Sequence, residues 1–156
     1  MLLMLLISSP NRNVINVLPA RKEKVMPIDL DFLYLLKGIA GNEGVPGAPL
    51  LHFYLTVNSE TGAVTGHAKQ TQAIPPPNNV IPIDNIKGRL RNLGLGSYIK
   101  VVYLEGRAIV SLPPPAIGEL VLPFEAIFVF NNDWKGKGSW SIGNKHVDDV
   151  PVEATI

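Results

Sequence analysis

Histidines are the first residues to consider for chemistry in this sequence, and there are three of them, His52, His67 and His146. Strand alternation places His52 and His67 on one face of a hairpin, on opposing strands. A metal site needs about three or four convergent ligands and a second shell. Asp84 or Glu125 could supply a third ligand, but nothing in the sequence fixes one. We therefore interpret the pair as ordinary histidines on a solvated strand face and predict no metal site.

Sequence motifs of common enzyme classes are absent. There is no Gly-x-Ser-x-Gly elbow for a serine nucleophile. The chain has no cysteine, which excludes thiolate nucleophiles, disulfides and cysteine-based zinc sites. Gly94-Leu95-Gly96 precedes a strand instead of a helix, so it cannot hold phosphate at a helix N-terminus. We therefore predict a protein that is not an enzyme, with no catalytic residues and no cofactor.

Two tryptophans, Trp134 and Trp140, flank a turn of lysines and glycines and are the best signal for ligand binding. Exposed aromatic rings beside polar donors stack on sugar rings or line partner surfaces. Tyr54 and His67, on the outer face of the hairpin, would extend such a surface. The alternative is that both indoles fill one end of the fold, because large aromatic side chains are usually mostly buried. The candidate ligand-binding residues are therefore Trp134, Trp140, Tyr54 and His67.

A basic stripe, formed by Lys87, Arg89 and Arg91, has the spacing of one strand face. Such a stripe is typical of a solvated face or of an edge protected against pairing. The formal net charge is only +1, which argues against a nucleic-acid surface. We predict no nucleic-acid partner.

The stretch 120–130 carries apolar residues on both of its alternating faces, which indicates a central strand or one at an interface. Its second face has more apolar surface than a monomer would expose. We therefore predict contact with a protein partner or with a second copy of the chain. The candidate interface residues are Phe128 and Val129.

The clearest structural signal is the stretch 50–73, which predicts a hairpin. Apolar and polar residues alternate from Leu51 to Asn58, and Ser59–Gly62 then supplies a polar turn whose glycine can adopt a positive φ. One register matches large with small residues on the inner face and polar with polar residues on the outer face, and a slip by one residue would destroy both matches. The pairs of this register are Val57 with Val64, Leu55 with Gly66, Phe53 with Ala68, Thr56 with Thr65, Tyr54 with His67 and His52 with Lys69.

The rest of the chain predicts an all-β fold, an antiparallel β-sandwich built from hairpins without substantial helix. Gly and Pro number 14 each, charged residues are sparse, and no long window has a convincing helical period. We expect one domain, residues 26–143, with roughly seven to nine strands. The expected elements are strands at 27–37, 86–91, 120–130 and 139–142, a proline-rich crossover at 74–83, a second hairpin at 98–112 that turns at Glu105-Gly106, and a frayed polar tail at 144–156.

Residues 1–25 precede the first strand pattern. Met1–Ile7 is apolar but far shorter than the roughly 20 residues of a membrane span. Neither basic residues before it nor a small-residue cleavage site soon after it mark a signal peptide. We interpret residues 1–25 as a non-native or disordered extension ahead of a natural start at Met26, with a degenerate signal anchor as the alternative. We therefore expect no membrane span and, by default, a cytoplasmic protein.

A motif in the hairpin region resembles a known family. Val45-Pro46-Gly47-Ala48-Pro49 leads into an aliphatic strand, and Val57-Asn58 is followed by a Thr-Gly turn and Val64-Thr65-Gly66. This pattern resembles a family of bacterial β-rich domains known only as a domain of unknown function. The resemblance covers about residues 27–142. It implies a bacterial origin and assigns no activity.

These observations are compatible with three classes of function. We favour a non-catalytic binding or protein-interaction module that self-associates. The alternative is a carbohydrate- or lipid-binding domain. A hydrolase comes third, because it would need pocket chemistry that the sequence does not show.

Overall fold

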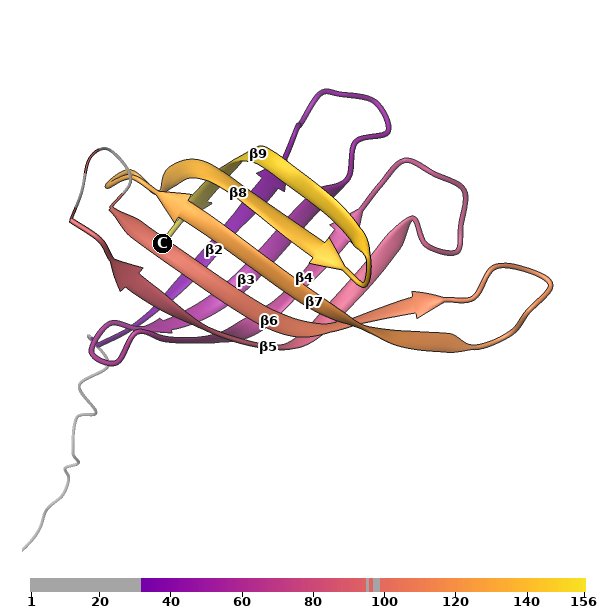
Figure 1. Ribbon diagram of the computed structural model, residues 1–156, viewed down its shortest axis with the longest axis horizontal. Coiled ribbons are helices and arrows are strands. Elements are labelled where there is room, and N and C mark those ends of the chain that lie inside the picture. Colours follow the sequence, from indigo (N-terminus) through magenta and orange to yellow (C-terminus); the bar gives the residue numbers. More distant parts are fainter. Residues whose placement is uncertain (1–31, 95, 97–98) are drawn as a thin grey trace, which may run out of the picture. The chain divides into compact units, whose positions relative to one another are not determined.

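The computed structural model describes residues 32–94, 96 and 99–156, and these residues form a closed antiparallel barrel of eight strands (Figure 1). Each strand pairs with the next one along the chain, and the last strand pairs back with the first. The strands are β2 (Leu33–Gly41), β3 (Leu50–Asn58), β4 (Ala63–Thr71), β5 (Val80–Asn92), β6 (Lys100–Ser111), β7 (Glu119–Phe130), β8 (Lys135–Ile142) and β9 (Lys145–Thr155).

Two short segments close the barrel. Residues Lys37–Ala40 of β2 pair with Val152–Thr155 of β9 in an antiparallel ladder. The prediction of an all-β, antiparallel fold is confirmed, but the predicted sandwich is wrong. Sandwiches and up-and-down barrels both bury one face of each strand, so they share the same alternation of apolar and polar residues. Only the pairing of the first and last strands separates them, and alternation does not reveal that pairing.

The last strand occupies the stretch that was predicted to be a frayed polar tail, so that prediction is wrong. β9 buries Val150, Val152 and Ala154 inside the barrel. Asp149 has a φ of 55°, and the register between β8 and β9 shifts beside it, which is the geometry of a β-bulge. The bulge breaks the alternation, and the acidic pair Asp148-Asp149 makes this strand resemble polar surface.

Two further boundaries differ from the prediction. Glu105-Gly106 is not a turn, because β6 runs unbroken through it. Gly106 lies opposite the buried Phe124, and a β-carbon there would come within 2.9 Å of the Ile86 side chain. The glycine therefore serves a close approach of strands. The crossover predicted at 74–83 is too long, because β5 already begins at Val80.

The predicted hairpin is confirmed, together with its register. All six pairs occur in the ladder between β3 and β4. Gly62 has a φ of 78°. Asn58 closes the turn, because its side-chain oxygen accepts hydrogen bonds from the backbone N–H groups of Glu60 and Thr61 at 2.9 and 3.1 Å. Polarity matching thus identifies which residues of this hairpin face outward.

Aromatic rings fill the interior of the barrel. Phe53 stacks on Phe128 with ring centroids 5.1 Å apart, and Phe128 meets Phe130 edge to face at 6.1 Å. Phe128, predicted at an interface, is wholly buried inside, whereas Val129 lies half-buried on the outer face. Among the described residues, no polar or charged side chain is buried. The buried interior therefore supplies packing, and polar side chains lie at the outer surface or at the ends of the barrel.

The extension predicted at 1–25, the natural start at Met26 and the first part of the strand expected at 27–37 lie outside the described residues. Within residues 32–94 and 99–156, no helix is long and apolar enough to cross a membrane.

We predict that Phe128→Ala lowers the free energy of unfolding by about 3–5 kcal/mol, because it leaves a cavity between Phe53 and Phe130. The neighbouring variant Ile127→Ala, at a side chain that is 48% exposed, should cost less than about 1 kcal/mol. Urea denaturation followed by circular dichroism measures both. Equal costs for the two variants would contradict the inward orientation of Phe128.

Candidate functional site

Both tryptophans that were predicted to bind ligand belong to the packing of the barrel. Trp140 is 2% exposed and donates its indole N–H to Gln70 Oε1 over 2.8 Å. Trp134 packs edge to face on Tyr34 and Phe130, with ring centroids 6.1 and 5.3 Å away. Both indoles are therefore packed in the fold, as in the alternative interpretation, but they do not share one end of it, because their packing partners differ.

Tyr54 and His67, the other two candidate binding residues, form a pair on the outer face. They are cross-strand neighbours on β3 and β4. Their rings stack at a centroid distance of 5.2 Å and an interplanar angle of 22°. Tyr54 is 40% exposed. Because one side of the phenol ring packs on His67, the opposite side is the one that Tyr54 can offer to a ligand.

Tyr54 borders a hollow of about 650 Å³ on the outer surface, where β9, β2 and β3 meet, and we call this the outer hollow. The loop 42–49 contributes Glu43 and Val45 to its wall. The strand register arranges the floor in two rows of paired residues. The first row is Thr155, Lys37 and Tyr54, and the second row is Glu153, Ile39 and His52.

The outer hollow combines an aromatic ring with groups that donate and accept hydrogen bonds. Lys37 supplies an ammonium group, while Glu43 and Glu153 supply carboxylates. His52 Nε2 lies 3.2 Å from Thr71 Oγ1, a contact that orients the imidazole. Because the charges are mixed, the hollow suits a neutral polar ligand better than a strongly charged one.

The floor of the outer hollow depends on a glycine in the middle of β2. A β-carbon at Gly38 would lie 2.6 Å from Cζ of Phe53 and 2.9 Å from the Cα of Ala154. The missing side chain lets the Phe53 ring fill the barrel on the inner side of β2. On the outer side of the same strand, Lys37 and Ile39 are part of the hollow. Core packing and the hollow are therefore built on one segment.

Of the predicted binding residues, Tyr54 borders the outer hollow and His67 stacks on it, whereas Lys37, Glu43 and Glu153 were not predicted. Glu153 was hidden because β9 was interpreted as a tail, and Lys37 was placed at the end of a strand with no known neighbour. The signal that could have revealed β9 is the alternation of apolar residues close to the C-terminus, which indicates a last strand.

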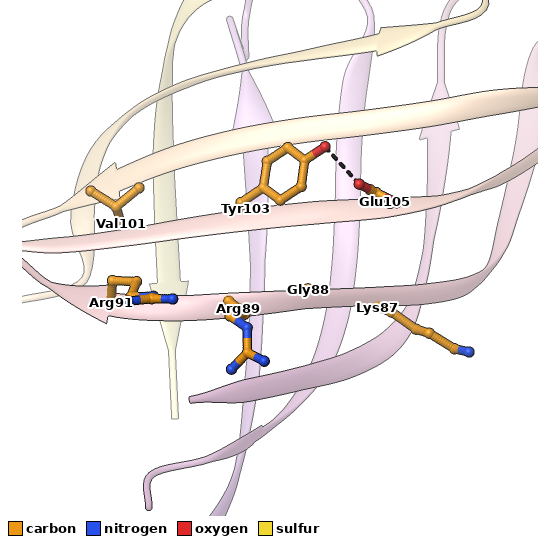
Figure 2. A pocket seen from close by; sticks show the side chains of 7 residues that line it. All are labelled: Lys87, Gly88, Arg89, Arg91, Val101, Tyr103 and Glu105. Atoms are coloured by element: carbon orange, nitrogen blue, oxygen red, sulfur yellow. Dashed lines mark hydrogen bonds between the residues drawn. The ribbon is translucent and has the colours of Figure 1, made fainter. Parts of the chain in front are cut away.

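A second hollow, of about 480 Å³, lies beside the basic stripe on the outer face of β5 and β6. Figure 2 shows the side chains of Lys87 and Arg89 directed away from Tyr103. Arg89 Nη1 instead lies 3.4 Å from the carbonyl oxygen of Thr61. Because these cations do not converge, the stripe forms an exposed face and not a cradle for an anion.

Tyr103 donates its phenol O–H to Glu105 Oε2 over 2.8 Å (Figure 2). This hydrogen bond raises the pKa of Tyr103 above its ordinary value, because ionisation would break the bond and set two negative charges side by side. Slight desolvation and the charges of Glu105 and Glu125 shift the pKa in the same direction. The shift keeps the phenol protonated, and able to donate this hydrogen bond, to higher pH than an ordinary tyrosine.

The histidines do not assemble a metal site in the part of the chain that the structure describes. No group of three histidine, aspartate or glutamate side chains lies close enough together there to hold a metal ion. His52 and His67 are diagonal neighbours on β3 and β4. Asp84, considered as a third ligand, instead lies 3.7 Å from the guanidinium of Arg107.

One family of proteins matches most of the described barrel. The model of a family described as Domain of unknown function (DUF1842) matches residues 31–146, from the start of β2 to the start of β9. The match confirms the expected resemblance to a family of unknown function, while the bacterial origin which that resemblance implies stays a prediction. No curated protein matches the chain.

We predict that Glu105→Gln lowers the pKa of Tyr103 toward its ordinary value, because the variant removes the charge that opposes phenolate formation. A raised pKa means that the folded protein holds this proton more tightly than the unfolded chain. Its contribution to stability is therefore present below the ordinary tyrosine pKa and lost as the pH rises through the folded one.

An NMR titration of the Tyr103 ring resonances measures this pKa directly. Glu125→Gln is the matched control, because the charge of Glu125 contributes less to the shift. A pKa of Tyr103 that is the same in the wild type and in Glu105→Gln would show that the negative charge of Glu105 does not raise it.

Proposed function

Because the chain belongs to the DUF1842 family, whose function is unknown, we propose its function from the outer hollow: the barrel is a non-catalytic carbohydrate-binding domain. The ligand class is a neutral saccharide, with one sugar ring against Tyr54. The observation that carries this proposal is the Tyr54 ring, which is stacked on His67 and borders the outer hollow.

Tyr54 has the properties of a platform for a sugar ring. The face of an aromatic ring carries partial negative charge, which attracts the polarised C–H groups on the flat side of a sugar. The His67 stack holds the phenol ring in place before any ligand arrives. Binding then loses less side-chain entropy than it would at a freely rotating ring.

The polar groups of the hollow complement sugar hydroxyls. A hydroxyl both donates and accepts hydrogen bonds. Lys37 can donate to it, and Glu43 and Glu153 can accept from it. The hollow of about 650 Å³ falls within the usual range for small-molecule sites, about 300–1,000 Å³.

The same carboxylates are poorly placed for hydrolysis, which supports binding without catalysis. The general acid of a glycosidase needs a raised pKa, usually obtained from an apolar, desolvated environment. Glu43 and Glu153 are both exposed to solvent. They are suited to accept hydrogen bonds and not to protonate a leaving group.

We predict that Tyr54→Ala weakens saccharide binding about tenfold or more, because it removes the stacking platform. A glycan array of neutral and acidic saccharides identifies the preferred class, and calorimetry with the best neutral saccharide then gives the affinities. Tyr103→Ala is the matched control, because Tyr103 is also 40% exposed but lies on β6, outside the hollow. An array without any neutral saccharide hit, or equal losses in both variants, would refute the proposal.

The outer face of β7 favours a second candidate, self-association. Val121 and Ile127 are 61% and 48% exposed, and Val129 lies on the same face. Exposed apolar side chains that gather on one surface are typical of contact sites between chains. The candidate partner is a second copy of the chain.

We predict for this second candidate that Ile127→Asp converts a dimer into a monomer, because it places a charge in the contact. Size-exclusion chromatography with light scattering measures the mass, and circular dichroism checks that the barrel is intact. A wild-type protein that stays monomeric at high concentration would rule out self-association through this face.

A further inference from the structure

The two ends of the barrel differ. At one end Trp134 packs between Tyr34 and Phe130, and the Lys100 ammonium lies 4.8 Å from the centroid of its ring. At the opposite end, where Figure 1 shows the loops 42–49, 72–79 and 112–118, a pocket of about 340 Å³ enters the barrel. We call this pocket the mouth. The mouth is distinct from the outer hollow, with which it shares no lining residue.

The mouth has apolar as well as polar walls, and most of the apolar side chains come from the inner faces of the strands. Trp140 lies next to its deep side, since the indole N–H binds Gln70, which lines the pocket. Apolar walls in a partly enclosed pocket favour an apolar ligand group. The apolar lining residues are Pro49, Ile74, Ile81, Val110, Leu122, Ile142 and Val147.

Two polar residues occupy inward register positions at the mouth. Gln70 pairs with Leu51 on one side and Ile81 on the other, both of which are buried. Lys145 pairs with the buried Ile142. Among the described residues, no polar side chain is buried in the barrel. Gln70 and Lys145 are therefore inward polar residues at the open end of an apolar interior.

Hydrogen bonds hold the rim of the mouth in place. The Asn78 side chain donates to the carbonyl oxygen of Ser111 over 2.8 Å and accepts from its N–H over 2.9 Å. The Gln72 side chain donates to the carbonyl oxygen of Gly47 over 2.9 Å. These bonds tie the loop 72–79 to β6 and to the loop 42–49, which pre-organises the pocket.

Asn144 and His146 also line the mouth, but the two inward residues, Gln70 and Lys145, offer hydrogen-bond donors to a ligand. Gln70 uses its side-chain oxygen to accept from Trp140, which leaves its amide N–H groups as what it can offer a ligand. Lys145 adds an ammonium group at the rim. Donors and a positive charge beside apolar walls match a ligand with an anionic acceptor group and an apolar chain. We propose that the mouth binds a monocarboxylate with an unbranched hydrocarbon chain, the chemistry of a short fatty acid.

The geometry assigns the two parts of the ligand to different residues. The chain lies against Val110, Leu122 and Ile142, and the carboxylate pairs with Lys145 at the rim. A charged head at the rim keeps its hydration on one side, so binding does not require burial of a full charge. Displacement of water from apolar walls supplies most of the affinity, and Lys145 supplies the preference for an acid over an alcohol.

Titration of the full chain with sodium octanoate tests this inference by two-dimensional NMR, with octan-1-ol and sodium acetate as matched probes. The expected result is binding of octanoate, weaker binding of octan-1-ol and none of acetate. The indole N–H resonance of Trp140 should shift, because its acceptor Gln70 lines the mouth, while that of Trp134 at the sealed end should stay in place.

The variant Lys145→Ala should weaken octanoate binding about threefold to fivefold and leave octan-1-ol binding unchanged, as expected for an exposed ion pair. Lys87→Ala, which removes a lysine from the distant outer face of β5, should change neither. The inference is overturned if octanoate leaves the Trp140 resonance in place at saturation, or if Lys145→Ala weakens both probes equally. Saccharide binding at the outer hollow is measured separately, so either proposal can fail alone.

Discussion

The ladder between Lys37–Ala40 and Val152–Thr155 is the contact on which the rest of the structure depends. It joins the two ends of the described chain, so it is a non-local pairing whose closure opposes chain entropy. Without it, β2 and β9 would be open edges and the phenylalanines of the interior would meet water. The outward side chains of this ladder line the outer hollow. The pairing that closes the barrel therefore also forms part of the floor of the outer hollow.

The packed interior decides where ligands can bind. A barrel of eight strands has an interior just wide enough for side chains or one small ligand. Here Phe53 and Phe128 stack across it and Trp134 closes one end. The space that is left lies on the outer surface and at the mouth. β9 contributes lining residues to both places, so this strand links the two proposed sites.

The sequence was most informative where contacts are local. The register of the β3–β4 hairpin followed from polarity matching, and it brought Tyr54 and His67 together correctly. Long-range pairing was not accessible, because alternation says which face of a strand is buried but not which strand lies beside it. The bulge at Asp149 hid β9, and the strand glycine Gly106 resembled a turn. Both errors arise where backbone geometry overrides a simple period of two.

We propose that the surface where β9, β2 and β3 meet binds a sugar, and amide chemical-shift mapping with the preferred neutral saccharide is the measurement to make. We expect the largest shifts at Lys37, Tyr54 and Glu153, on three strands that only the closed barrel brings together. Shifts confined to β5 and β6, or none at saturating saccharide, would refute sugar binding at this surface.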